Sequence, residues 1–119
     1  VYVNKQLTMG VINFKETKVY KLAFEVAMEI FEISKNFKEE TYSLTDQIRR
    51  SSRSVCANIA EAYGKKRYPA HFISKASDED TENSETGVWL EFSVACKYIS
   101  QEKYKTLSEK NKEAGRLLG

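Results

Sequence analysis

Proline and glycine are scarce in this chain, which has one proline and five glycines in 119 residues. Because both residues interrupt regular structure, their scarcity favours long helices over many short strands. The chain also lacks an apolar run approaching the roughly 20 residues of a membrane span, and no signal-peptide pattern is present. We therefore expect one all-α domain in the cytoplasm.

Residues that carry enzymatic chemistry are equally sparse. The two cysteines, Cys56 and Cys96, have no CxxC spacing, and His71 is the only histidine, so a zinc site is not expected. A di-iron bundle needs Glu-x-x-His motifs, and His71 has no glutamate three residues before it. No glycine-rich phosphate loop or catalytic triad pattern is present. We predict no catalytic, cofactor-binding or metal-binding residues.

The charges of the chain nearly balance, with 19 cationic and 17 anionic residues and a net charge of +2. This balance excludes a strong overall basic field, but it permits a local basic patch. A content of 41% hydrophobic and 30% charged residues is typical of a folded globular domain.

The apolar periodicity predicts four helices at about residues 17–36, 44–64, 69–98 and 101–118, after a flexible N-terminal arm at residues 1–15. Their short connections predict an antiparallel up-down-up-down four-helix bundle. In the first helix the polar residues form one narrow stripe, and the rest of the circumference is apolar. A helix of this kind is buried on more than one side, which indicates an interface between copies of the chain as well as an internal core.

The second helix carries three arginines in its first half, Arg49, Arg50 and Arg53. They form either a nucleic-acid-binding face or the partners of nearby carboxylates. Antiparallel pairing around the turn near residues 66–67 places them level with an acidic stretch of the third helix. We therefore favour an ion network in which Arg49 and Arg53 bridge to the acidic stretch and Arg50 also meets Asp46. The acidic partners expected are Asp80, Glu82 and Glu85.

The remaining cations at one end of the bundle are the candidate nucleic-acid contacts. Lys65, Lys66 and Arg67 form the turn after the second helix, and Lys15 and Lys18 precede or begin the first. Contacts with RNA there would run through phosphates and depend strongly on salt. The alternative is an ordinary solvated turn.

Two rows of acidic residues could bind magnesium, so a magnesium-dependent phosphohydrolase is the least favoured alternative. The rows are Asp78, Glu82 and Glu85 on the third helix, and Glu25, Glu29 and Glu32 on the first. Arginines at the same level would neutralise the first row, which argues against this alternative.

Several segments of the sequence resemble a known family. The segments QIRRSSRSVCANIAEAYGKKR and ETGVWLEFSVACKYIS, in this order and spacing, are similar to the proteins encoded by intervening sequences of bacterial 23S ribosomal RNA genes. Ala62 departs from the family pattern, which usually has glycine there. The resemblance implies a four-helix bundle that assembles as a ring-like homopentamer. It also implies kinship to the accessory variability protein of diversity-generating retroelements, which binds nucleic acid and a reverse transcriptase.

These observations lead us to expect a non-enzymatic, oligomeric bundle that binds structured RNA or a ribonucleoprotein through basic surface residues. The alternative is a protein–protein adaptor without RNA affinity. We expect no cofactor, no membrane contact and no small-molecule substrate.

Overall fold

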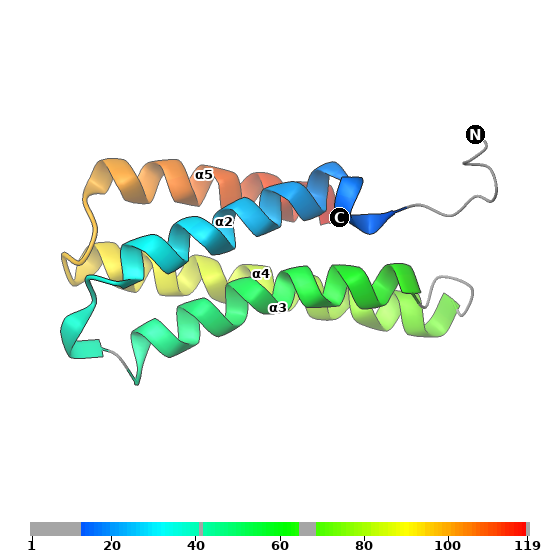
Figure 1. The fold of residues 1–119 in the computed structure, drawn as a ribbon, viewed down its shortest axis with the longest axis horizontal. Coiled ribbons are helices and arrows are strands. Elements are labelled where there is room, and N and C mark those ends of the chain that lie inside the picture. Colours follow the sequence, from blue (N-terminus) through cyan, green and yellow to red (C-terminus); the bar gives the residue numbers. More distant parts are fainter. Residues whose placement is uncertain (1–12, 41, 65–68, 119) are drawn as a thin grey trace.

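The computed structural model describes residues 13–40, 42–64 and 69–118, and within helix α4 it describes the side chains of residue 78 and of residues from 80 onward. Four long helices pack side by side and run lengthwise along the molecule (Figure 1). They are α2 (Lys18–Ser34), α3 (Leu44–Gly64), α4 (Pro69–Ala95) and α5 (Gln101–Leu118), with short 3-10 turns η2 (Phe14–Glu16) and η3 (Lys38–Glu40). The described residues contain no strand, and the predicted four-helix bundle is confirmed.

Hydroxyl side chains cap the beginnings of two helices. Thr17 Oγ1 accepts a hydrogen bond from Tyr20 N at 3.2 Å at the start of α2. Ser100 Oγ accepts one from Lys103 N at 3.0 Å at the start of α5. Each cap satisfies a backbone donor that has no partner inside the helix, so these residues specify where the helices begin.

Helix α4 ends at Ala95 rather than near residue 98, and α2 ends at Ser34 rather than residue 36. Lys97 adopts the left-handed backbone conformation with φ of 67°. Its N–H donates to Val94 O at 3.0 Å, and Tyr98 N donates to Ser93 O at 2.9 Å. These bonds close the helix early and turn the chain toward α5.

The core is divided into three levels along the bundle. Large side chains form the large-residue cluster at the end where α2 finishes, with members Val26, Ile30, Phe37, Leu44, Ile48, Leu90 and Leu107. The small-residue cluster, Ala23, Val55 and Ile59, lies toward the other end. Between Ile48 and Val55 on α3, a buried polar layer interrupts the apolar packing; its members are Ser51, Ser52, Asn83, Thr86 and Asn111.

The polar layer satisfies its own hydrogen bonds across three helices. Asn83 Nδ2 donates to Asn111 O at 3.1 Å, and Asn111 Nδ2 donates to Asn83 O at 3.2 Å. Thr86 Oγ1 donates to Ser51 Oγ at 2.8 Å. A Cβ at Gly87 would lie 3.2 Å from Asn111 Nδ2, so this glycine allows α4 and α5 to approach closely at the amide pair.

The end of the bundle near the start of α2 includes part of the predicted N-terminal arm. Phe14, within η2, packs edge-on against Tyr20 with ring centroids 5.2 Å apart. Residues 14 and 15 therefore belong to the bundle, whereas residues 1–12 of the predicted arm lie outside the described residues. No helix in the described ranges is both long and apolar enough to cross a membrane.

Candidate interaction surfaces around helix α3

Arg50 forms the ion pairs between α3 and the acidic stretch of α4. Its Nη1 lies 3.3 Å from Glu82 Oε1, and its Nη2 donates to the Glu85 carboxylate. Glu85 also accepts a hydrogen bond from Trp89 Nε1 at 3.1 Å, and Arg50 Nη2 is 3.4 Å from Gln47 Oε1. Arg50 therefore lies beside the acidic stretch of α4, as the antiparallel pairing of α3 and α4 predicted.

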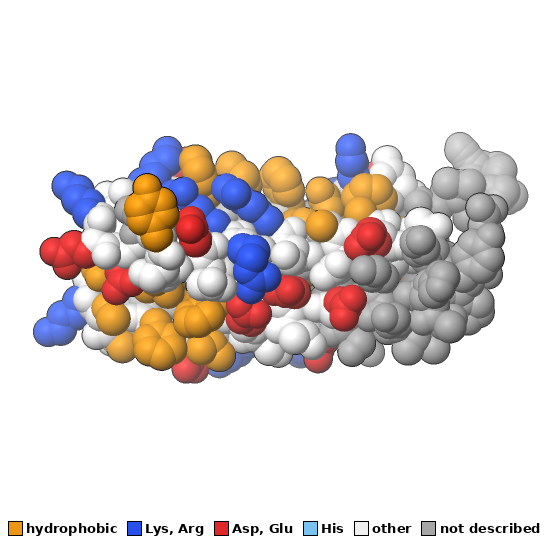
Figure 2. Space-filling view, turned by 90° about the horizontal axis from the view of Figure 1, so that it is seen from below, with side chains coloured by type: hydrophobic (Ala, Val, Ile, Leu, Met, Phe, Trp, Pro, Cys, Tyr) orange, Lys and Arg blue, Asp and Glu red, His pale blue; other side chains and the backbone are white. Residues whose placement is uncertain are grey.

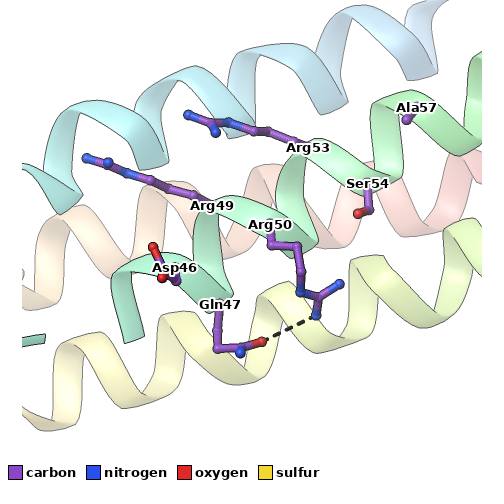
Figure 3. A pocket seen from close by; sticks show the side chains of 7 residues that line it. All are labelled: Asp46, Gln47, Arg49, Arg50, Arg53, Ser54 and Ala57. Atoms are coloured by element: carbon purple, nitrogen blue, oxygen red, sulfur yellow. Dashed lines mark hydrogen bonds between the residues drawn. The ribbon is translucent and has the colours of Figure 1, made fainter. Parts of the chain in front are cut away.

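Arg49 and Arg53 point in the other direction, toward α2 (Figure 3). Arg49 Nε donates to Ser34 Oγ at 2.7 Å, and its Nη2 donates to Phe31 O at 3.3 Å. The guanidinium carbons of Arg49 and Arg53 lie 4.8 Å and 6.0 Å from the Phe31 ring centroid. Arginine over an aromatic face gains cation–π attraction.

This geometry corrects the predicted ion network. Arg49 and Arg53, four residues apart, share one helical face, whereas Arg50 is turned by about 100° toward α4. The expected bridges from Arg49 and Arg53 to the carboxylates are replaced by the stack on Phe31. Asp80 and Asp46 are exposed, and neither forms an ion pair within the described part of the chain.

Beside this stack, apolar side chains of α2 remain exposed to solvent. Phe24 keeps 49% of its surface and Met28 keeps 46%, and the Tyr20 and Phe24 rings stack with centroids 6.0 Å apart. Together with the stack they form a surface that we call the arginine–aromatic face: Tyr20, Phe24, Met28, Phe31, Arg49 and Arg53. It combines a cationic region with exposed apolar area.

A second surface lies on the α4 side of α3. We call it the acidic–aromatic groove, and it is lined by Glu40, Tyr42, Ser43, Leu44, Gln47, Trp89, Phe92 and Cys96. Phe92 is 52% exposed, and its ring lies 5.9 Å from that of Trp89. Val88, also on α4, is exposed as well. This groove contains one carboxylate and no cationic residue among its lining side chains.

The carboxylate of the groove is held in its charged form. The Ser43 hydroxyl donates to Glu40, which lowers the pKa of this carboxyl despite the opposing effect of partial burial. Tyr98 Oη donates to Glu40 Oε2 at 3.3 Å and lowers the pKa further. Burial, followed by the neighbouring Glu40 charge, raises the pKa of Tyr98.

On the face seen from below, hydrophobic side chains gather in two groups at opposite edges, with lysine, arginine and acidic side chains between them (Figure 2). The exposed large hydrophobic residues of the helices include Phe24 and Met28 on α2, and Val88 and Phe92 on α4. Two apolar regions on either side of a charged band are more than scattered exposed residues, and such patches are typical of interaction sites.

Of the predicted nucleic-acid contacts, the structure describes two, Lys15 and Lys18. Lys15 and Lys18 are exposed in η2 and at the first position of α2. Lys65, Lys66 and Arg67 lie outside the described residues, but the sequence places them directly after Gly64, the last residue of α3. Gly64 and Lys18 lie toward the same end of the bundle (Figure 1).

Several carboxylates of the acidic rows are paired with cations of the chain itself. Lys110 of α5 bridges to Glu25 at 2.5 Å and also contacts Glu29. These hydrogen bonds raise the pKa of Lys110, and the contact with Lys110 lowers the pKa of Glu25. Among the described residues, no group of three or more histidine, cysteine or acidic side chains is arranged to hold a metal ion.

The two cysteines differ in their environments. Cys56 is partly buried beside the small-residue cluster, and burial raises the pKa of its thiol to about 11. Cys96 is exposed at the acidic–aromatic groove. Neither forms a disulfide.

The fold and these surfaces define a helical bundle with exposed apolar and charged faces around one helix. Over residues 15–119 the chain matches the family of 23S rRNA-intervening sequence proteins, and it belongs to this family. It is similar to the crystal structure of a protein of unknown function from the S23 ribosomal protein family of Bacteroides thetaiotaomicron. The two are 32% identical with a TM-score of 0.75, over 84% of this chain and 94% of that one. No curated protein of similar sequence was found.

Proposed function

We propose that this chain is a non-enzymatic, self-assembling protein that binds structured RNA or a ribonucleoprotein. The observation that carries the proposal is the pairing of exposed large apolar side chains on α2 and α4 with exposed cations at one end of the bundle. The apolar surfaces support assembly, and the cations support contact with phosphates. Four of the six acidic residues that an alternative magnesium enzyme would use, Glu25, Glu29, Glu82 and Glu85, are engaged by Arg50 and Lys110.

The end of the bundle near Lys15 and Lys18 is the proposed RNA contact. These two lysines are exposed, and neither forms an ion pair within the described residues. The sequence places three more cations directly after Gly64, and α3 ends at Gly64 toward the end of the bundle where α2 begins. A multimer would bring several copies of this end together and raise the affinity for one RNA molecule through multivalency.

Gel retention of a structured RNA tests this contact. We expect retention at about 50 mM salt and loss of it near 200 mM, because phosphate contacts release counterions. Charge reversal of Lys15 and Lys18 to Glu should weaken binding by at least tenfold. The matched control, Lys103→Glu with Lys105→Glu on α5, changes the charge equally and should have a smaller effect. Absence of retention at about 50 mM salt would overturn the RNA proposal.

The second candidate, a protein–protein adaptor without RNA affinity, is favoured by the exposed apolar side chains alone. It shares the expectation of self-assembly, for which the resemblance to the family suggests a pentamer. Size-exclusion chromatography with light scattering measures the assembly directly. A multimer that retains no RNA would support the adaptor, whereas a monomer at all concentrations would contradict self-assembly.

A further inference from the structure

The two surfaces beside α3 differ in charge but share exposed apolar area. We infer that copies of this chain associate head to tail, with the arginine–aromatic face of one copy docked on the acidic–aromatic groove of the next. This inference rests on the proposed self-assembly and specifies which surfaces meet. The occupant of each surface is therefore a second copy of the same chain.

The apolar components of the two surfaces provide the attraction. Phe24 and Met28 on one surface keep 49% and 46% of their area exposed. Phe92 and Tyr42 in the groove keep 52% and 91%, and Val88, about one helical turn before Phe92 on α4, keeps 45%. Aromatic side chains and methionine are enriched at the centres of protein interfaces, where their burial dominates the affinity.

The charges of the two surfaces determine the pairing. Arg49 and Arg53 stack on the same Phe31 ring, and neither forms an ion pair with a carboxylate within the described residues. The nearby carboxylate of Asp46 offsets only part of this charge. The groove offers Glu40, whose carboxylate is the one charged group among its lining side chains. An arginine–carboxylate contact across the interface would therefore be favourable.

The same charges disfavour contacts between identical surfaces. Two arginine–aromatic faces in contact would bring four guanidinium groups close together, and two grooves in contact would oppose their Glu40 carboxylates. Like charges across an interface cost free energy and suppress that pairing. A contact between unlike surfaces is heterologous, so each copy uses both surfaces, and the assembly either closes into a ring or extends as a filament.

The positions of the surfaces allow both to be occupied at once. Arg49 and Arg53 point toward α2 (Figure 3). The groove is instead lined by residues of α3 and α4 and by residues that precede α3. Arg50, with its ion pairs to Glu82 and Glu85, occupies the region between them. One copy can therefore contact two neighbours through different sides of α3.

A mixing experiment with two complementary variants tests the inference. The face variant carries Phe24→Glu and Arg53→Glu, and the groove variant carries Val88→Lys and Phe92→Lys. Each variant retains one intact surface, so each alone should be monomeric by light scattering. An equimolar mixture should form a 1:1 dimer and nothing larger, because only one pair of intact surfaces remains. Leu117→Glu on α5 is the matched control, since it also places a charge at an exposed apolar position, and it should leave the mass of the wild-type assembly unchanged.

Each outcome of this experiment decides a specific point. A wild-type monomer would overturn self-assembly itself. A wild-type multimer whose variants fail to form the mixed dimer, or remain multimeric alone, would overturn the assignment of the two surfaces. Loss of RNA retention in the face variant without loss of mass would show that this face binds RNA instead. Circular dichroism checks that each variant is folded. If the face variant does not fold, Phe24→Gln replaces it, and if the groove variant does not fold, Phe92→Gln replaces it. The same mixed dimer is expected.

Discussion

The two ends of the bundle core are stabilised in different ways. At the end where α2 finishes, large side chains such as Phe37, Leu90 and Leu107 are almost completely buried. Toward the other end, the described part of the cluster consists of Ala23, Val55 and Ile59, and partly buried side chains such as Tyr20 and Tyr63 pack against it. Between them the asparagine pair replaces apolar contacts with hydrogen bonds. The first end stabilises the fold mainly by burying apolar surface. The polar layer instead fixes the position of α4 against α5, because a shift of either helix would break the amide hydrogen bonds.

The largest expected effect compares two isoleucines on α3. Ile48 in the large-residue cluster and Ile59 in the small-residue cluster are 0% and 1% exposed. We expect Ile48→Ala to cost toward the upper part of the range of about 2–5 kcal/mol, and Ile59→Ala toward the lower part. The described neighbours of Ile48 are almost completely buried and relax less into the cavity than the partly buried side chains beside Ile59. Urea denaturation measures both losses. Equal losses would show that the two ends do not differ in packing.

The next effect concerns the polar layer. Asn83→Ala removes the bond from Asn83 Nδ2 to Asn111 O and leaves a cavity in a buried layer, so we expect a loss of about 1–3 kcal/mol in the free energy of unfolding. Both bonds end on backbone carbonyls, so each substitution removes only its own bond, and in a double-mutant cycle the losses from Asn83→Ala and Asn111→Ala should be close to additive. A strongly reduced loss for the second substitution in urea unfolding would contradict two independent bonds.

A smaller effect separates two neighbouring arginines. Arg49 bonds to Ser34 and to the Phe31 carbonyl beside the large-residue cluster, so Arg49→Ala should cost about 1–2 kcal/mol. Arg50 is 48% exposed in its ion pairs, and Arg50→Ala should cost at most about 1 kcal/mol. The two variants remove the same side chain one position apart, and the melting temperature compares them. A larger loss for Arg50 would reverse this ranking.

The smallest effect depends on pH and concerns Lys110, which joins α5 to α2 at Glu25 and Glu29. The pKa of Glu25 is lowered from an ordinary 4.5, so its contribution to stability is complete above pH 4.5 and is lost as the pH falls through the lowered value. Lys110→Gln should therefore cost less than about 1 kcal/mol at pH 7, because the pair is partly exposed, and less still at pH 3. Thermal unfolding at both values checks the difference, which should not grow in acid.

The sequence was sufficient to predict the helices, because their periodicity and caps are local properties. The bounds of α3 and α5 agree with the predictions, whereas α4 ends early because Lys97 adopts a left-handed conformation that sequence patterns rarely reveal. The level of the arginines against α4 was also predictable from antiparallel pairing. The partner of each arginine depends on how α3 is rotated about its own axis, and the sequence does not give this rotation. The structure shows that Arg49 and Arg53 face Phe31 of α2.

The groove could not be predicted from the sequence. It combines residues from the α3 start and the α4 end with Tyr42 and Glu40, which precede α3, and their proximity depends on how the chain turns after η3. The contact between Asn83 and Asn111 could not be predicted either, because the two residues are 28 positions apart and nothing in the sequence around them distinguishes them from surface asparagines. Two glycines mark the close approach of the helices there, since a Cβ at Gly87 would lie 3.2 Å from Asn111 Nδ2 and one at Gly115 would lie 3.0 Å from Asn83 Nδ2.

Because the two thiols have different surroundings, the native protein can be labelled selectively at one cysteine. A maleimide dye reacts with thiolate, so the partly buried Cys56, with its pKa of about 11, should label slowly near neutral pH, while exposed Cys96 labels readily. A single fluorophore would then sit at the rim of the acidic–aromatic groove without any engineered mutation. Its accessibility to a soluble quencher would report whether the groove is empty or covered.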